Sequence, residues 1–213
     1  MSSVAIIDYG MGNLHSIAKA LQHVAGGVTV KVTSDPSVMR QADRVVFPGV
    51  GAIRDCMVAL QERELSDVIK ELAADRPFLG ICLGMQALLE ESEENGGISC
   101  LGLIPGKVVR FPDGLTSHSG DVLKIPHMGW NRLHQAIEHP LWQGIAQDSW
   151  YYFVHSYYVV PVLSAHVAAT TNYPDPLAAA ISHENLFAVQ FHPEKSQEAG
   201  LRLLDNFLRW VPI

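Results

Sequence analysis

A cysteine lies at the junction between an expected strand and an expected helix. The apolar residues 77–79 precede it, and residues 85–90 after it are typical of a helix. Free N–H groups and the dipole at the start of a helix favour a thiolate, the nucleophilic form of cysteine. Gly80 and Gly84 lack the Cβ atoms that would crowd such a turn. The pattern predicts Cys82 as a nucleophile; the alternative is a small buried side chain.

A histidine and a glutamate follow another expected strand. His192 and Glu194 flank Pro193 directly after residues 187–191. Side chains at the carboxyl ends of parallel strands point into the crevice where ligands bind. An imidazole can take a proton from a thiol at one nitrogen while a carboxylate orients the other. This predicts His192 as base and Glu194 as its orienting group; the alternative is a purely structural histidine.

Small residues after a third expected strand could supply an oxyanion hole. Gly49, Val50 and Gly51 follow the strand at residues 44–47 closely. Attack on an amide creates a negative oxygen, which pre-aimed backbone N–H groups stabilise. Val50 or Gly51 could donate together with Leu83. By itself the segment indicates an ordinary turn, so the interpretation depends on the two other motifs.

The first half of the chain alternates strands and helices, which predicts a parallel sheet covered on both faces. Strands are expected at residues 4–8, 28–32, 44–47 and 77–79, and helices at 17–24, 52–73 and 85–90.

After Glu94 the chain changes to short strand-like segments separated by glycine and proline, which predict antiparallel strands. They lie at residues 107–111, 122–125, 150–154, 166–170, 177–181 and 187–191, before an amphipathic helix at 201–208. The predicted fold class is α/β, with a mixed, largely parallel central sheet, helices on both faces and a small antiparallel sheet. We expect one domain over residues 1–213.

Composition excludes several classes of protein. The 213 residues are 48% hydrophobic and 17% charged, which fits one globular domain with a substantial core. A net charge of -7 argues against nucleic acid as the main partner. The longest apolar run, residues 77–89, is too short to span a bilayer, and no signal peptide is visible.

The cysteine pattern indicates neither a disulfide framework nor a zinc site. Cys56, Cys82 and Cys100 are odd in number and have no C-x-x-C spacing. A reducing cytoplasm is the simplest setting for such a chain.

Taken together, the motifs resemble the class I (triad) glutamine amidotransferases, whose core is flavodoxin-like. The three segments around the triad carry this resemblance. A narrower resemblance, to the glutaminase subunits of imidazole glycerol phosphate synthases of histidine biosynthesis, covers nearly the whole chain. It is carried by DYGMGN at residues 8–13, PHMGWN at 126–131 and HPEKS at 192–196.

The resemblance implies roles for individual residues. It implies Cys82 as nucleophile, His192 as base and acid, and Glu194 as the group that orients His192. The oxyanion loop of Gly49, Val50 and Gly51 would rearrange before it donates. The substrate L-glutamine would be held by Gln86, Glu94, Ser156 and Tyr157.

The resemblance also implies a partner. Ammonia would pass to a cyclase subunit, a (βα)8 barrel, which forms imidazole glycerol phosphate and aminoimidazole carboxamide ribotide. We expect a one-to-one heterodimer, no metal and no cofactor. The implied partner face consists of Asn13, His127, Met128, Trp130 and Lys195.

Three other functions are weighed against this one. A stand-alone hydrolase of γ-glutamyl amides would use the same triad but would need no partner face. A non-catalytic scaffold subunit would not need Cys82 and His192. A flavodoxin-like nucleotide binder is disfavoured because residues 9–13 match neither GxGxxG nor GK[ST].

Overall fold

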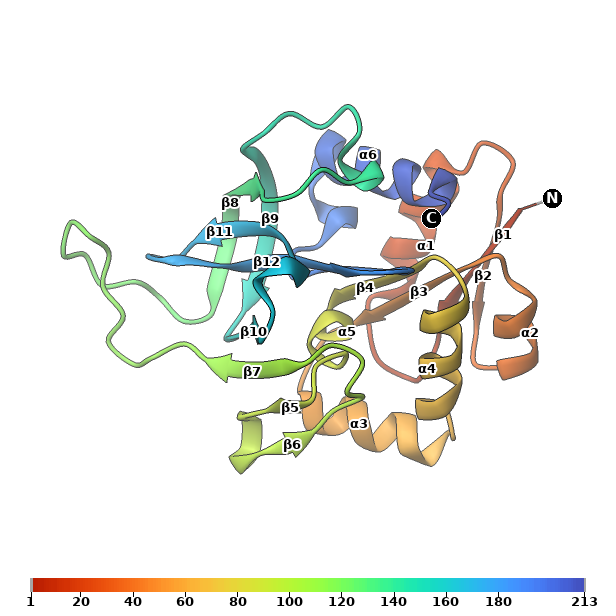
Figure 1. Cartoon of the computed structure of the whole chain (residues 1–213), viewed down its shortest axis with the longest axis horizontal. Coiled ribbons are helices and arrows are strands. Elements are labelled where there is room, and N and C mark those ends of the chain that lie inside the picture. The colour runs from red at the N-terminus through yellow and green to blue at the C-terminus, as the bar shows by residue number, and fades with distance from the viewer. Residues whose placement is uncertain (1, 213) are drawn as a thin grey trace.

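Five parallel strands form one half of a long sheet, in the order β2-β1-β3-β4-β13 (Figure 1). The computed structural model describes residues 2–212. Every residue of β4 and β13 is buried, as expected for parallel strands between two helical layers. Strands β1 to β4 confirm the predicted parallel core, whereas β13, expected among the antiparallel strands, pairs in parallel with β4 and antiparallel with β12 (Pro176–His183). Their bounds are β1 Ser3–Ile7, β2 Thr29–Thr33, β3 Arg44–Gly49, β4 Phe78–Cys82 and β13 Leu186–Val189.

Helices cover both faces of these strands. One layer consists of α1 (Leu14–Val24) and α6 (Gln197–Arg209), which contact each other. The opposite layer consists of α2 (Pro36–Gln41), α3 (Ile53–Glu62) and α4 (Ser66–Asp75) (Figure 1). The sheet therefore separates two apolar cores.

Strand β1 shows how one strand contributes to both cores. Val4 and Ile6 belong to the cluster that includes α1 and α6, whereas Ala5 and Ile7 belong to the cluster that includes α3 and α4. Successive side chains of a strand point to opposite faces, so a continuous apolar run is what a doubly covered strand requires.

The prediction of one helix over residues 52–73 is wrong. The chain forms α3 and α4, which are separated where Glu64 adopts a φ of +56°. The Leu65 N–H bonds to the Leu60 carbonyl across the break. In one continuous helix, side chains five positions apart would point about 140° away from each other. The break allows Leu60 and Leu65 both to be fully buried.

The helix after Cys82 is also shorter than the predicted 85–90. Helix α5 spans Leu83–Gln86 only. The Ala87 and Leu88 carbonyls accept hydrogen bonds from N–H groups of residues 101, 103 and 104 instead of from a next helical turn. The loop at 101–104 thus replaces the helix that local sequence favours.

Antiparallel pairs form most of the other half of the sheet, in the order β13-β12-β10-β7, and β5 then pairs in parallel with β7 and antiparallel with β6. Strand β11 joins β12 to β8, and β8 pairs with β9 as an antiparallel ribbon. Bounds are β5 Glu91–Ser92, β6 Ile98–Ser99, β7 Gly106–Arg110, β8 His127–Gln135, β9 Ser149–His155, β10 Tyr157–Pro161, β11 Val167–Asn172 and β12 Pro176–His183. Short 3-10 helices are η1 Glu94–Gly96, η2 Pro140–Trp142, η3 Ser164–His166 and η4 Pro193–Lys195.

The sequence predicts four of these eight strands, namely β7, β9, β11 and β12. Residues 122–125 form no strand, and Val122 makes only an isolated bridge with Thr116. The two-residue strands β5 and β6 match no predicted strand, and neither do the longer strands β8 and β10. Both of these longer strands contain many polar or aromatic residues with irregular alternation, and they form because neighbouring strands supply their hydrogen bonds.

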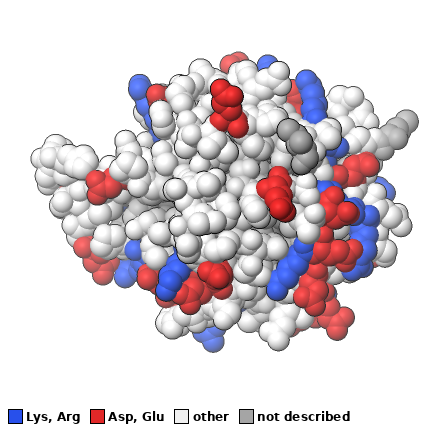
Figure 2. All heavy atoms as spheres, in the orientation of Figure 1, with Lys and Arg blue, Asp and Glu red and all other residues white. Residues whose placement is uncertain are grey.

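Charged side chains do not gather into a basic patch on the face drawn in Figure 2, where Lys and Arg lie among Asp and Glu. This distribution fits the net charge of -7. Between residues 2 and 212 no helix is both long enough and apolar enough to cross a membrane.

We predict that Glu64→Gly stabilises the protein. The left-handed backbone of Glu64 costs an L-residue about 1 kcal/mol, and glycine avoids most of this cost. Urea denaturation should show the free energy of unfolding rising by about 0.5–1 kcal/mol. The matched control, Glu62→Gly at the end of α3, should lower it by a similar amount. Equal destabilisation by both changes would contradict this account.

Candidate active site

The nucleophile candidate lies in a sharp strand-to-helix turn. Cys82 ends β4 with φ +54° and ψ -110°, and α5 begins at the next residue. A non-glycine residue in such a backbone conformation is held there by its surroundings. A Cβ on Gly84 would lie 1.9 Å from the Phe47 carbonyl oxygen, and one on Gly80 would lie 2.9 Å from the Ala188 Cβ. Both glycines are therefore needed for β4 and α5 to pack this closely.

His192 and Glu194 reach the same end of the sheet from the adjacent parallel strand. Strand β13 pairs with β4, and His192 follows it at the start of η4. His192 Nδ1 lies 2.9 Å from Glu194 Oε1, and both side chains are 3% exposed. The Glu194 carboxylate accepts a hydrogen bond from His192 Nδ1–H. The other ring nitrogen, Nε2, is therefore free to exchange a proton with Cys82.

The charge state of His192 follows from its neighbours. Burial alone lowers its pKa, but hydrogen bonding and charge from Cys82 and Glu194 outweigh burial and raise it to about 10. Nε2 nevertheless has no partner at strict hydrogen-bond distance among the described residues. The contact with Cys82 is therefore a loose one, as is common before substrate is bound. At neutral pH the arrangement favours an imidazolium beside the sulfur.

Within residues 2–212, the other two cysteines have no imidazolium beside them. Burial raises the pKa of the Cys56 thiol to about 12 and that of the Cys100 thiol to about 11. Both are free cysteines, as Cys82 is.

A cavity of about 450 Å³ opens in front of Cys82. This volume is in the range of small-molecule sites. Most of the predicted site residues line it: Val50, Gly51, Cys82, Leu83, Gln86, Glu94, Ser156, Tyr157 and His192. Ala52, Pro126, Val154 and His155 complete the lining. Segments from five separate parts of the chain, around residues 50–52, 82–94, 126, 154–157 and 192, thus meet at one cavity.

The predicted oxyanion loop packs directly against the nucleophile turn. Gly49 ends β3, and a Cβ there would lie 2.5 Å from Tyr9 Oη and 2.9 Å from Leu83 Cβ. Gly51 has a φ of +101°, which L-residues rarely adopt. Val50 and Gly51 of this loop line the same cavity as Cys82.

Glu94 lies at the edge of the cavity. Its Oε2 accepts a hydrogen bond of 3.0 Å from the Ile53 N–H, which is one of the free donors at the start of α3. This bond fixes a carboxylate at the cavity wall. The role in holding the substrate that the resemblance implies for Glu94 stays a prediction.

The sequence analysis missed Gln190. Its side chain is fully buried, and its Nε2 lies 3.7 Å from Cys82 Sγ. Its Oε1 accepts from Gln86 Nε2 at 3.0 Å, and Gln86 Nε2 also donates to the Tyr157 carbonyl at 3.1 Å. The sequence did offer a signal for Gln190, because it is a polar residue within the apolar segment 187–191. A buried amide side chain requires hydrogen-bond partners.

Four of the five predicted partner-face residues are exposed. Asn13 and Lys195 are exposed, Met128 is 65% exposed and Trp130 is 43% exposed. The Tyr152 ring connects two of them, because Lys195 Nζ lies 5.7 Å from its centroid and the Trp130 ring lies 6.1 Å from it. Met128 and Trp130 belong to β8.

The prediction that His127 lies on the partner face is wrong. Its side chain is only 3% exposed, so it cannot form part of a surface. It lies between the rings of Phe153 and Tyr173, with centroids 5.0 Å and 4.0 Å away, and bonds to His155. Alternation along β8 turns His127 inward while Met128 points outward.

A larger open groove of about 1410 Å³ lies elsewhere, between α6, residues 144–150 and Trp130. We assign the site to the smaller cavity because the groove is lined by neither Cys82 nor His192. In the part of the chain that the structure covers, residues 2–212, no three His, Cys, Asp or Glu side chains are grouped to hold a metal ion.

The chain's similarity to known proteins agrees with this geometry. The family model for class-I glutamine amidotransferases matches residues 5–210. Imidazole glycerol phosphate synthase subunit HisH of Methylococcus capsulatus is 68% identical over 100% of this chain and 98% of that protein. The HisH subunit of Nitrosococcus oceani is 60% identical, and the match covers 99% of this chain and 98% of that protein. The chain belongs to the HisH family of class-I glutamine amidotransferases.

Solved structures support the fold assignment. The structure of PurLQS from Thermotoga maritima superposes with a TM-score of 0.73 at 18% identity, covering 98% of both chains. A crystal structure of a glutamine amidotransferase superposes with a TM-score of 0.72 at 16% identity, covering 97% of this chain and 99% of that one. The fold of this HisH-family chain is thus the α/β fold of glutamine amidotransferases, as the resemblance implied.

We predict that Cys82→Ser lowers the pKa of His192. Cys82 raises this pKa through hydrogen bonding and charge, and a serine hydroxyl does not ionise in the same range, so the charge is lost. In NMR titrations the His192 ring should stay protonated through neutral pH in the wild type and lose its proton at lower pH in the variant. Cys100→Ser is the control and should leave the titration unchanged. A wild-type His192 that titrates at or below 6.5 would contradict the assignment.

Proposed function

We propose that the chain is the glutaminase subunit of an imidazole glycerol phosphate synthase, and that it hydrolyses glutamine to glutamate and ammonia. The observation that carries the proposal is the convergence of Cys82, His192 and Glu194 at adjacent strand ends beside one cavity. Membership of the HisH family supports the choice of substrate and pathway.

The first half of the reaction forms a thioester. The Cys82 thiolate attacks the side-chain amide carbon of glutamine, a C–S bond forms, and the carbonyl π electrons move to oxygen. When the carbonyl re-forms, the C–N bond breaks, and the leaving nitrogen takes the proton of the His192 imidazolium. Ammonia leaves, and a γ-glutamyl thioester stays on Cys82.

The second half reverses the roles. His192, now neutral, takes a proton from water, whose oxygen attacks the thioester carbon. The C–S bond then breaks and returns the thiolate, and glutamate is released. Glu194 holds the imidazole in one orientation throughout and favours its charged form. No step requires a metal or an organic cofactor.

The oxyanion of both steps needs N–H donors. Leu83 supplies a first-turn N–H of α5 that has no helical partner. Gly49, Val50 and Gly51 form the facing loop, from which a second donor comes after the loop changes its backbone orientation. The positive φ of Gly51 supports this, because glycine can exchange between such conformations at little cost.

The remaining cavity residues hold the substrate. Gln86 and the backbone of Ser156 and Tyr157 bind polar groups of glutamine, and Glu94 pairs with its α-ammonium group. The support for this role of Glu94 is its fixed carboxylate at the cavity wall.

A partner receives the ammonia. The relatives are named as subunits, which supports an assembly of at least two chains. We propose a one-to-one heterodimer with a (βα)8-barrel cyclase that forms imidazole glycerol phosphate and aminoimidazole carboxamide ribotide. Asn13, Met128, Trp130 and Lys195 would contact it, since exposed Met and Trp side chains are typical of interface cores.

Two further points complete the proposal. The chain is one domain, residues 1–213, because strands from its first and last thirds belong to one sheet. It works in the cytoplasm on a small-molecule substrate, with neither nucleic acid nor membrane as a partner. Its free cysteines suit a reducing compartment.

The deciding experiment measures glutamate release from glutamine. The wild type should release little alone and much more with the cyclase and its nucleotide ligand. Cys82→Ala should lose activity at least about 10³-fold under every condition because the nucleophile is gone. Cys100→Ala, a change at a protonated thiol away from the cavity, is the matched control and should retain activity.

Other outcomes would favour the alternatives. Full activity without the cyclase would indicate a stand-alone γ-glutamyl amide hydrolase. No activity in any combination would indicate a non-catalytic scaffold subunit.

A further inference from the structure

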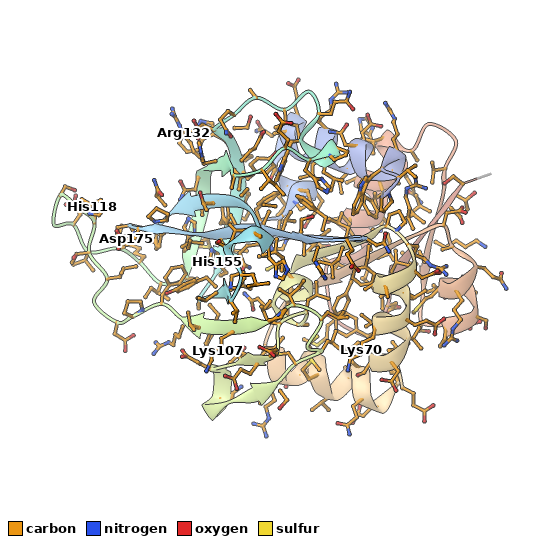
Figure 3. The ribbon with its side chains drawn as sticks, viewed as in Figure 1. Lys70, Lys107, His118, Arg132, His155 and Asp175 are labelled. Atoms are coloured by element: carbon orange, nitrogen blue, oxygen red, sulfur yellow. The ribbon has the colours of Figure 1, made fainter. Side chains whose placement is uncertain are left out.

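Two buried histidines take no part in the chemistry: His155 lines the glutamine cavity, and His127 lies behind His155. His127 in β8 and His155 in β9 face each other in the register of the ribbon. His127 Nδ1 lies 2.9 Å from His155 Nε2. Figure 3 shows the labelled His155 toward the middle of the molecule, whereas Arg132 marks the outer end of the same ribbon.

Their hydrogen bonds allow only one assignment of protons. His155 Nδ1 lies 2.8 Å from the Tyr157 carbonyl, which can only accept, so Nδ1 donates. His155 Nε2 must then accept from His127 Nδ1–H. His127 Nε2 in turn accepts from the Asn131 amide at 3.2 Å. Both rings are therefore neutral, and burial agrees with this because it lowers the pKa of His127 to about 3 and that of His155 to about 4.

The chain of hydrogen bonds continues to the nucleophile. The Tyr157 carbonyl that accepts from His155 also accepts from Gln86. Gln86 donates to Gln190, whose Nε2 lies 3.7 Å from Cys82 Sγ. Each donor along this path has an acceptor, so a shift at one end changes the geometry of the next bond.

The other end of this hydrogen-bond network, at His127, lies next to the protein surface. His127 is followed in β8 by the exposed Met128, and Trp130 lies two positions further on. A displacement of β8 would move His127 with it. The ribbon thus links an exposed apolar surface to the wall of the cavity through buried polar contacts.

We propose that His127 and His155 are positioning residues that hold the Tyr157 carbonyl, and through it Gln86, in the geometry that binds glutamine. The proposal rests on the glutaminase function proposed above and adds to it a route by which a partner on β8 affects substrate binding. His127 acts through His155 and touches neither the substrate nor Cys82.

The loss of one donor shows why the pair matters. Without His127 Nδ1–H, His155 Nε2 is a buried acceptor with no partner, which is unfavourable. His155 can relieve this by rotating its ring toward another donor, and the rotation removes its bond to the Tyr157 carbonyl. The Tyr157 carbonyl, to which Gln86 also donates, is then held by one donor fewer, whereas the His192–Glu194 hydrogen bond stays in place.

The test uses His127→Phe in the full chain, assayed with the cyclase subunit. Phenylalanine keeps the stacking on Phe153 and Tyr173 but can form neither hydrogen bond. We expect KM for glutamine to rise about tenfold, the loss of about one hydrogen bond, with kcat within about twofold of wild type. His127→Asn, whose amide can donate near the position of Nδ1, should restore KM to within about threefold.

A matched control separates positioning from packing. His139 is also a histidine whose pKa burial lowers, to about 4, and it packs on Phe187 and Trp210 away from the cavity. His139→Phe should leave KM unchanged. An unchanged KM in His127→Phe, or a fall in kcat and in melting temperature with KM unaltered, would overturn the proposal.

A second measurement does not depend on activity. Ring ¹⁵N shifts of the wild type should show both His127 and His155 as neutral tautomers with the proton on Nδ1. A cationic ring, or a proton on Nε2 of His155, would overturn the proposal even if glutaminase activity is present. If the wild type releases no glutamate but the tautomers are as expected, the proposed function fails and the hydrogen-bond assignment stands.

Discussion

The close contact between the turn at Cys82 and the end of β3 is the constraint on which the site depends. Gly84 lies so near the Phe47 carbonyl that no side chain fits between them. This contact brings α5 against β3 and holds Cys82 in a left-handed conformation at the end of β4. Cys82, the first N–H of α5 and the loop after β3 consequently meet at one place. The geometry of the candidate site is thus a result of sheet packing.

The sequence predicts much of this arrangement because each triad residue follows a strand directly. Parallel strands end at a common edge, so Cys82 and His192 could be placed together without knowledge of the path between them. The break at Glu64 could not be found, because no glycine or proline marks it. It forms so that Leu60 and Leu65 can both reach the core, and this requirement comes from tertiary packing.

The residues behind the cavity were harder to predict for a related reason. Gln190 and His155 belong to segments that the sequence analysis identified, but their partners come from other strands. The resemblance placed His127 on the partner face together with Met128 and Trp130, and only the pairing of β8 with β9 shows that it turns inward. Buried polar side chains are specified by their partners, and a single sequence does not show which partners meet.

The three cysteines have a practical consequence. Cys56 and Cys100 are kept as thiols by burial, and only Cys82 has an imidazolium beside it. A haloacetamide at neutral pH should therefore alkylate the protein once, and the mass gained would count functional sites in a preparation. The folded chain thus provides its own active-site titration, against which the specific activity of any variant can be normalised.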